Sequence, residues 1–310
     1  MIISKTPFRI SLGGGGTDLP KWYEKNGSMF ISGAIDKYMY ISLYRTPFFE
    51  GIHLKYSKNE TVDRVEDIEH DIIRQTLKAT SIENHLEIVS HADIPAGTGL
   101  GSSGSFGVGL VKAINPAMDK EELAKFATVV QMKDLRLPIG VQDQYAAAYG
   151  GVNVYSVDRG GVVSVEPLWA GYEAKMLTGI LEDRLVLFYT GIERDANEIL
   201  GGSSRNGMKN IQKLGHFSLD ALEKGNFRRF GELMHDHWRY KKRRHDNMTN
   251  SKVDNWYNLA IENGALGGKL IGAGGGGFLM FYTEDRKKLI EAMPLKHLDF
   301  KFDMEGSKIL

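Results

Sequence analysis

The stretch His91-Ala-Asp-Ile-Pro-Ala-Gly-Thr-Gly-Leu-Gly-Ser-Ser-Gly-Ser105 decides the fold that we expect for this chain. Residues 85–90 alternate apolar and polar side chains, which predicts a half-buried strand, and residues 106–114 have the pattern of a helix. Glycines in the loop between them allow tight turns and a close approach to a ligand. A helix that begins near Ser102 directs free N–H groups and the positive end of its dipole at that ligand, so the loop predicts a phosphate site. The loop glycines are Gly97, Gly99, Gly101 and Gly104.

Two other interpretations of this loop stay open. The loop lacks the Gly-Lys-Ser/Thr ending of a P-loop NTPase, but three of its glycines satisfy the dinucleotide fingerprint G-x-G-x-x-G. That fingerprint needs an acidic residue at the end of the next strand, about twenty residues on, and here Asp119 resembles the cap of another helix instead. A plain connecting turn is the other alternative. The hydroxyls of Ser102 and Ser103 are suited to a phosphate oxygen or to magnesium.

Length, charge and cysteine content limit the possible functions. A chain of 310 residues is long enough for two domains. Its 39 basic and 39 acidic residues give a formal charge of zero, so neither nucleic acid nor an anionic membrane is expected as the main partner. The absence of cysteine excludes disulfides, thiolate metal sites and a cysteine nucleophile. Because no signal-like segment and no long apolar run occur, we expect a cytoplasmic protein.

Another glycine-rich segment, the first along the chain, is Ser11-Leu-Gly-Gly-Gly-Gly-Thr-Asp-Leu-Pro20, which follows a predicted first strand at residues 2–10. Its backbone is suited to closing on a small polar ligand, and Asp18 is suited to accepting hydrogen bonds from sugar hydroxyls. The alternative is a flexible turn in which Asp18 caps a helix at residues 19–26. Arg9 lies at the end of the strand, where an isolated arginine is more often a surface charge. Further along, periodicity predicts strands at residues 28–44 and 51–57 and helices at 67–80 and 120–130.

The next informative segment, Leu137-Pro-Ile-Gly-Val-Gln-Asp-Gln-Tyr145, contains a carboxylate at the start of a predicted helix. Asp143 begins a helix of small residues, where it is placed to act as a general base or a charge partner. The other interpretation is an acidic residue of the first helical turn that the helix dipole favours. Short strands are predicted at 152–157 and 162–167, with a domain boundary near 168–173.

The C-terminal part is predicted to contain a buried strand at residues 185–190 and helices at 192–214 and 226–244. In the last helix His235 and His237 are two residues apart and face different sides, so they are no zinc pair. The basic run there forms either a solvated face or, through Lys241 or Lys242, a contact to an anionic ligand. A third glycine-rich segment, residues 264–277, precedes an apolar strand at 278–282, and we expect a loop packed against a ligand or against the first two glycine loops.

Together the three glycine-rich segments resemble those of the GHMP small-molecule kinases, the superfamily that includes galactokinases, homoserine kinases and mevalonate kinases. Pro95-Ala-Gly-Thr-Gly-Leu-Gly-Ser-Ser103 is similar to the ATP phosphate loop of that superfamily, and residues 5–18 and 270–277 are similar to its first and third motifs. Residues 139–145 and 237–242 are most similar to heptose 7-phosphate kinases, which phosphorylate the anomeric oxygen. The resemblance implies an α+β fold with an ATP-binding α/β domain at residues 1–170, an α+β domain at 171–310 and the active site between them.

The resemblance also implies roles for individual residues. Asp143 corresponds to the catalytic base and Arg9 to the basic residue that pairs with it, Asp18 holds sugar hydroxyls, and Ser103 coordinates Mg²⁺. ATP is then expected to contact Pro95, Gly97, Gly99, Leu100, Gly101, Ser102, Ser103 and Gly104. The sugar substrate is expected to contact Gly14, Gly15, Gly16, Thr17, Asp18, Gly274, Gly275, Gly276, Lys241 and Lys242.

One position departs from the superfamily pattern. A glutamate for magnesium usually precedes the catalytic aspartate by about a dozen residues, and here that alignment gives Gln131. An amide offers one oxygen to the metal but no charge, so Gln131 stays a candidate ligand, with the nearby Asp134 as a possible compensation. The expected partner is a small sugar or sugar phosphate, and a homodimer is possible.

Overall fold

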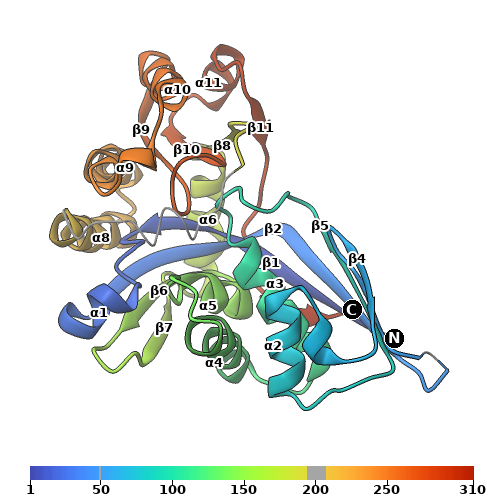
Figure 1. Cartoon of the computed structure of the whole chain (residues 1–310). Coiled ribbons are helices and arrows are strands. Elements are labelled where there is room, and N and C mark those ends of the chain that lie inside the picture. The colour runs from blue at the N-terminus through green and yellow to red at the C-terminus, as the bar shows by residue number, and fades with distance from the viewer. Residues whose placement is uncertain (49, 194–206) are drawn as a thin grey trace.

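The computed structural model describes residues 1–48, 50–193 and 207–310, and its larger sheet is built around two long antiparallel strands (Figure 1). The first, β1 (Ile2–Gly13), pairs with β2 (Ser28–Arg45) over nearly its whole length. One half of β2 pairs with β5 (Leu86–Ala92) and the other half with β6 (Val152–Val157), so this strand joins both parts of the sheet. The sheet is completed by β3 (Ile52–Lys55), β4 (Asn59–Val62), β7 (Val163–Pro167) and β12 (Lys308–Ile309).

Four helices cover one face of this sheet (Figure 1). The central one, α3 (Ser102–Ile114), begins at Ser102 as predicted and packs against β1 and β2. The predicted helix at 67–80 is shorter, α2 (Asp71–Ala79), because the His70 side chain caps it by accepting a hydrogen bond from Ile73 N–H. The other two helices, which contact α3, are α4 (Lys120–Thr128), which continues as a π-helical turn (Val129–Asp134), and α5 (Gln142–Tyr149).

The C-terminal half is built on a second sheet of four strands. These are, in spatial order, β11 (Lys296–Leu298), β8 (Leu185–Tyr189), β10 (Phe278–Thr283) and β9 (Ala265–Leu270). The helices of this half are α6 (Gly171–Arg184), α8 (Met208–Glu223), α9 (Phe227–Lys242), α10 (Ser251–Glu262) and α11 (Arg286–Ala292). No helix of the described residues is long and apolar enough to cross a membrane.

Two predictions need correction in this half. Residues 265–270 form strand β9, not part of a loop, because their glycines lie where a side chain has no room. A Cβ on Gly267 would lie 2.2 Å from the carbonyl oxygen of Gly231 in α9, so the strand and the helix pack backbone to backbone. The helix predicted at 192–214 falls largely on residues 194–206, outside the described ranges, together with Asp195 and Glu198; residues 208–214 are helical, whereas 192 and 193 are not.

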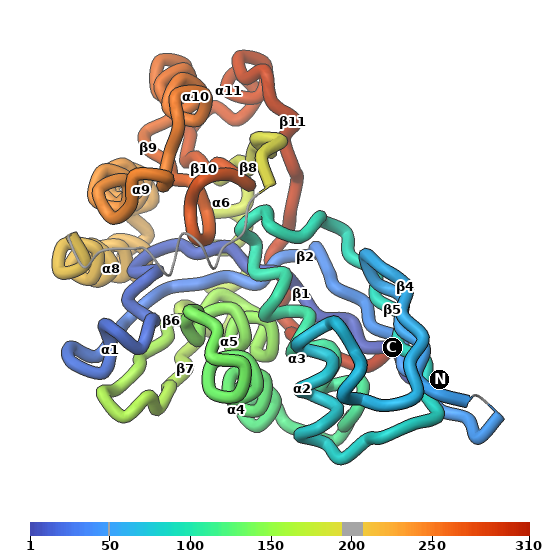
Figure 2. Tube along the Cα trace, viewed as in Figure 1, coloured from blue at the N-terminus to red at the C-terminus, as the bar shows by residue number. Residues whose placement is uncertain are grey.

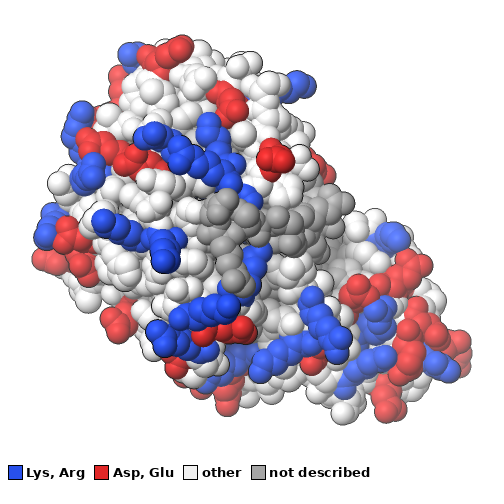
Figure 3. Space-filling model, turned by 60° about the vertical axis from the view of Figure 1, so that its left-hand side comes forward, with Lys and Arg blue, Asp and Glu red and all other residues white. Residues whose placement is uncertain are grey.

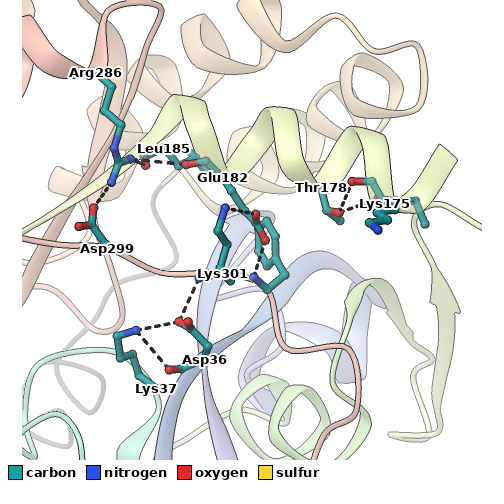
Figure 4. A network of polar contacts seen from close by, with 11 residues as sticks. Asp36, Lys37, Lys175, Thr178, Glu182, Leu185, Arg286, Asp299 and Lys301 are labelled. Atoms are coloured by element: carbon teal, nitrogen blue, oxygen red, sulfur yellow. Dashed lines mark hydrogen bonds and ion pairs between the residues drawn. The ribbon is translucent and has the colours of Figure 1, made fainter. Parts of the chain in front are cut away.

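Polar contacts join the two halves along the end of the chain. Glu182 of α6 accepts hydrogen bonds from Phe302 N–H (2.7 Å) and Lys301 Nζ (2.9 Å), and Lys301 N–H donates to Asp36 of β2 (Figure 4). The chain then returns to the first sheet, where β12 pairs with β1 and the two termini lie near each other (Figure 2). The division at residue 170 stays a prediction, and the last residues pack against the N-terminal sheet.

Acidic and basic side chains are both spread over the face of the molecule that Figure 3 shows, which agrees with the formal net charge of zero.

Candidate active site

The three glycine-rich segments meet at one cavity of about 400 Å³, lined by residues of both halves of the chain. The phosphate loop and the first segment both contribute backbone and side chains to its wall, and the third segment contributes residues 269–273. Of the predicted site residues, those that line the cavity are Arg9, Gly15, Gly16, Asp18, Gly97, Gly99, Gly101, Ser102, Ser103, Asp143 and Lys241. Those outside its lining are Gly14, Thr17, Pro95, Leu100, Gly104, Gln131, Lys242, Gly274, Gly275 and Gly276.

The third segment braces the phosphate loop from behind. Gly272 and Gly277 lie directly against the phosphate loop, because a Cβ on Gly272 would lie 2.6 Å from Cα of Gly99 and one on Gly277 would meet the carbonyl oxygen of Thr98. This contact confirms the predicted packing of the segment against the phosphate loop. Its middle part turns away from the cavity, because Gly275 N–H donates to the carbonyl oxygen of Met248 (3.0 Å). A link to the first segment comes from β9, where Lys269 Nζ donates to the carbonyl oxygen of Leu12 (3.0 Å).

The phosphate loop has the geometry that its sequence predicts. Gly101 caps α3 in the left-handed conformation (φ 84°), which a residue with a side chain rarely adopts. The first N–H groups of α3 therefore begin at Ser102 and Ser103, beside the cavity. Asp119, by contrast, caps α4 in a capping box with Glu122 and does not end a strand, so the acidic residue required by the dinucleotide interpretation is missing.

An ion pair between Arg9 of β1 and Asp143 of α5 lies beside the phosphate loop. Arg9 Nε and Nη2 lie 2.8 and 2.7 Å from Oδ1 of Asp143, and Arg9 Nη1 donates to the carbonyl oxygen of Gly99 (2.6 Å). The Arg9 side chain is 5% exposed and that of Asp143 is 32% exposed. Arg9 is thus a buried group of the cavity wall, not the surface charge that its sequence position alone suggests. The guanidinium holds the Asp143 carboxylate beside the backbone that is expected to carry the phosphates.

Asp18 is buried in the cavity wall. Its carboxylate accepts hydrogen bonds from Gly16 N–H (2.9 Å) and Gln142 N–H (3.3 Å), and burial, followed by the charge of Asp143, raises its pKa. Gly140 packs against it so closely that a Cβ there would lie 1.8 Å from Oδ2. The helix-cap alternative for Asp18 is wrong, because α1 (Pro20–Asn26) has Leu19 at its N-cap and no side-chain cap. A carboxylate in this setting can accept hydrogen bonds from the hydroxyls of a sugar.

Gln131 lies beside the site without facing the cavity. Its Nε2 donates to the carbonyl oxygen of Ser103 (3.1 Å), and its Oε1 accepts a hydrogen bond from Gln144 (2.7 Å). The amide joins the π-helical turn to the first turn of α3 and to α5, with its oxygen already in use. Its metal role remains a prediction without a favourable geometry. Within the described part of the chain, no group of three or more His, Cys, Asp or Glu residues forms a metal site.

Few of the residues that line this cavity can coordinate magnesium. In phosphoryl-transfer sites it keeps several waters and takes one or two carboxylates plus the nucleotide phosphates. Ser103, whose hydroxyl sits at the start of α3, and the Asp143 carboxylate are the residues that fit such an ion. The exposed Asp134 does not line the cavity.

Basic side chains of the C-terminal half form another wall of the cavity. Lys241 donates to the carbonyl oxygens of Leu270 (2.7 Å) and Gly272 (2.5 Å), whereas Lys242 pairs with Asp254 (3.2 Å) and is directed elsewhere. Lys269 of β9 lines the wall too, and burial, followed by the charge of Arg9, lowers its pKa to about 7.

Two further groups complete this basic wall. They are Arg244, just after α9, and His237 on the same helix. Burial lowers the pKa of His237 well below its usual value, and the charges of Lys269, Lys241 and Arg244 add to the effect. Sequence reasoning missed Lys269 and His237 as site residues because only the pairing of β9 and the packing of α9 bring them to the cavity.

One end of the cavity is lined by residues of the N-terminal half that are largely apolar. Met39, Ile72 and Phe106 line it, and the His70 ring stacks on Phe106 with ring centroids 4.8 Å apart. Burial lowers the pKa of His70, which favours the neutral ring in this setting. No motif in the sequence indicated this end of the cavity, which is suited to a flat, weakly polar group.

The comparisons with known proteins identify families for both halves of the chain. The model of the GHMP kinases N-terminal domain matches residues 54–151, and that of the GHMP kinases C-terminal domain matches residues 218–298. A D-glycero-alpha-D-manno-heptose 7-phosphate kinase of Campylobacter jejuni is 32% identical, over 99% of this chain and 98% of its own length.

Solved structures have the same fold. The crystal structure of a D-glycero-D-manno-heptose 1-phosphate kinase from Bacteroides thetaiotaomicron superposes with a TM-score of 0.80 at 24% identity, over 100% of this chain and 99% of the other. A putative sugar kinase of Campylobacter jejuni superposes with a TM-score of 0.75 at 28% identity, over 100% and 98% of the two chains. The predicted α+β architecture is therefore confirmed.

Proposed function

The chain belongs to the GHMP kinase family, and from this premise we propose that it transfers the γ-phosphoryl group of ATP to a hydroxyl of a sugar phosphate, namely the anomeric oxygen of D-glycero-D-manno-heptose 7-phosphate. The observation that carries the proposal is the Arg9–Asp143 pair, held against the phosphate loop inside the cavity. The similarity to a heptose 7-phosphate kinase over nearly the whole chain supports the choice of sugar.

The nucleotide would lie along the N-terminal wall of the cavity. Its triphosphate fits the N–H groups of the phosphate loop and the first turn of α3, and its base fits the apolar end beside His70 and Phe106. A volume of about 400 Å³ lies within the usual range for small-ligand pockets. Mg²⁺ held by Ser103 and the phosphates would neutralise negative charge on the β- and γ-phosphates.

The protein's own residues then have separate tasks. Asp18 accepts hydrogen bonds from substrate hydroxyls and orients the sugar. The reacting hydroxyl passes its proton to the Asp143 carboxylate as its oxygen bonds to the γ-phosphorus, and the bond from that phosphorus to the bridging oxygen breaks to leave ADP. Arg9 keeps Asp143 in place and offsets charge that develops between the carboxylate and the phosphate loop.

A related function with weak catalysis is the second candidate. The amide at Gln131 supports it, because a charge that the family usually supplies near the metal is absent from this position. Such a protein would bind ATP and a sugar phosphate in the same cavity but turn over slowly.

A coupled assay of ADP release over free and phosphorylated hexoses and heptoses tests the proposal. We expect the highest kcat/KM with heptose 7-phosphate and much lower values with galactose and fucose. A preference for a free hexose would replace the proposed substrate. ATP binding without sugar-dependent ADP release would favour the weakly catalytic relative.

A further inference from the structure

Arg244 is a buried cation that forms no salt bridge with a carboxylate of the described residues; burial lowers its pKa, and the charge of Asp18 opposes that effect. Its side chain lines the cavity, the residue is 4% exposed, and its Nε and Nη2 have no hydrogen-bond partner among the described residues. Its Nη1 packs over the first glycine loop, so closely that a Cβ on Gly16 would lie 2.5 Å away. A buried guanidinium normally has acceptors for its five N–H groups, because leaving them unpaired costs stability. Two of its nitrogens therefore lack an acceptor among the described residues, on a side chain that lines the cavity.

The residues around Arg244 make this part of the cavity cationic. Lys241 comes from helix α9 and Lys269 from the adjacent strand, where burial lowers the pKa of Lys269 to about 7. Burial, followed by the charges of Lys269, Lys241 and Arg244, lowers the pKa of His237, so its neutral ring adds a hydrogen-bond donor and no charge. Among the described residues that line the cavity, the acids are Asp18 and Asp143, and Asp143 is paired with Arg9. The remaining acid, Asp18, is itself buried with its carboxylate bound to two backbone N–H groups.

We propose that Arg244, with Lys241, His237 and Lys269, forms a second anion subsite that holds the phosphate monoester of the sugar substrate, apart from the loop that holds the nucleotide phosphates. This inference rests on the proposed kinase function and extends it to the choice between free and phosphorylated sugars. The guanidinium fork matches the oxygens of a phosphate and binds them through two parallel hydrogen bonds.

The subsite and the nucleotide loop are built from different halves of the chain. The phosphate loop and Arg9 belong to the N-terminal half, whereas Arg244, Lys241 and Lys269 belong to the C-terminal half. Arg244 reaches the first glycine loop at Gly16, whose N–H binds Asp18, so the cation lies next to the residue expected to hold sugar hydroxyls. A ligand with hydroxyls at Asp18 and an anionic end at Arg244 fits this order of groups.

The subsite explains how the enzyme would reject a free sugar. A sugar without a phosphate leaves the buried guanidinium unpaired, and sites built around a buried polar partner discriminate strongly against ligands that lack it. We therefore expect wild-type kcat/KM to be at least about 100-fold higher for heptose 7-phosphate than for the unphosphorylated heptose.

The test compares Arg244→Met, Arg244→Lys and the control Arg243→Met. Arg243 is the adjacent arginine, exposed and placed over the Tyr240 ring, so the control removes the same charge outside the cavity. ADP release is measured with heptose 7-phosphate and with unphosphorylated heptose. We expect Arg244→Met to raise KM for the phosphorylated sugar by about 10- to 100-fold, with KM for ATP and the rate with free heptose unchanged.

The remaining variants fix the interpretation. Arg244→Lys should fall between wild type and Arg244→Met, because a lysine keeps the charge but loses the bidentate geometry. Arg243→Met should match wild type. Methionine in place of an unpaired buried arginine is not expected to unfold the protein, which thermal unfolding verifies. An unchanged KM in Arg244→Met, or an equal loss with both sugars, would overturn the subsite.

Calorimetry separates a failure of the subsite from a failure of the proposed function. Heptose 7-phosphate is titrated into protein saturated with a non-hydrolysable ATP analogue and magnesium, so no turnover is needed. Binding by wild type that weakens in Arg244→Met supports the subsite even if no sugar is phosphorylated. Equal binding by wild type and Arg244→Met overturns it even if the kinase activity is confirmed, and so does the absence of any binding.

Discussion

Replacing Asp143 by asparagine separates the chemical role of this carboxylate from its structural one. The amide has nearly the same shape but can no longer take up the proton of the attacking hydroxyl. A positioned general base contributes roughly 10²- to 10⁴-fold to a rate, so we expect kcat of Asp143→Asn to fall by about that factor. The phosphate loop is unchanged, so ATP affinity should stay within about threefold of wild type.

A loss of stability should accompany the loss of rate. Breaking a buried ion pair costs about 3–5 kcal/mol because the remaining charge is left uncompensated. Here Asp143 is 32% exposed, and Arg9 keeps its bond to the Gly99 carbonyl, so water and that bond reduce the cost. We expect the free energy of unfolding of Asp143→Asn to be lower by about 1–2 kcal/mol.

Single-turnover ADP formation gives the rate, and urea unfolding gives the stability. Asp134→Asn is the matched control, since Asp134 is an exposed acid outside the cavity and should change neither quantity. If Asp143→Asn retained kcat within threefold of wild type while fully folded, Asp143 would not be the base. A rate that fell only in proportion to the unfolded fraction would reduce its role to structure.

Three more perturbations address other parts of the wall. In Gly140→Ala the new Cβ would lie 1.8 Å from Oδ2 of Asp18 and would therefore displace the Asp18 carboxylate. We expect the KM for the sugar to rise at least about tenfold in steady-state kinetics, with the KM for ATP unchanged. In Gln131→Glu an oxygen faces the Ser103 carbonyl, 3.1 Å from the present nitrogen, and urea unfolding should show a loss of about 1–3 kcal/mol. Lys269→Met should remove the contribution of Lys269 to the pH dependence of stability. The pKa of Lys269 is about 7 in the folded protein and 10.5 ordinarily, so between these values the unfolded state binds more protons. The contribution of Lys269 to wild-type stability should therefore rise with pH over this range. Below pH 7 both states are protonated and the full burial cost is present, so urea unfolding at pH 6 and pH 9.5 should show the larger advantage of Lys269→Met at pH 6.

Each of these has a clear contrary result. Gly160→Ala places a Cβ on an exposed turn without a close backbone contact, and it should leave kinetics unchanged. An equal effect of both glycine substitutions would show that Gly140 acts only through folding. A large gain in rate for Gln131→Glu would mean that the carboxylate reaches the metal and that the wild-type enzyme is weakly catalytic. An advantage of Lys269→Met that is equal at pH 6 and pH 9.5 would show that folding does not lower the pKa of Lys269.

The parts of the site that the sequence predicted are those fixed by local chemistry. The start of α3 at Ser102 follows from a strand, a glycine-rich turn and a helical pattern in succession, and the structure has that order. Asp143 was placed correctly in the first turn of a helix, although its ion pair with Arg9 joins residues 134 positions apart and is set by strand and helix packing. Local patterns identify where a motif begins, whereas partners at such distances depend on the fold.

The errors have a physical cause of the same kind. Gly267 looks like a loop residue in the sequence, but its missing side chain lets β9 pass against the backbone of α9. That packing also buries Lys269, a lysine between glycines and apolar residues that carries no motif of its own. Lys242 belongs to a conspicuous basic run and yet pairs with Asp254 outside the cavity. Of the two lysines that the basic run suggested, Lys241 lines the cavity and Lys242 does not.

The two proposed anion sites use different sources of positive charge, and this difference suits their ligands. The nucleotide loop relies on backbone N–H groups and a helix dipole, which carry no net charge and cost little when no ligand is present. The Arg244 subsite relies on whole charges that are buried at a cost to stability, and a phosphate monoester recovers that cost only when it binds. A protein that had to accept uncharged sugars would gain stability by replacing Arg244 with an apolar residue. Its presence, buried and without a carboxylate partner among the described residues, is therefore best explained by a substrate that brings its own negative charge.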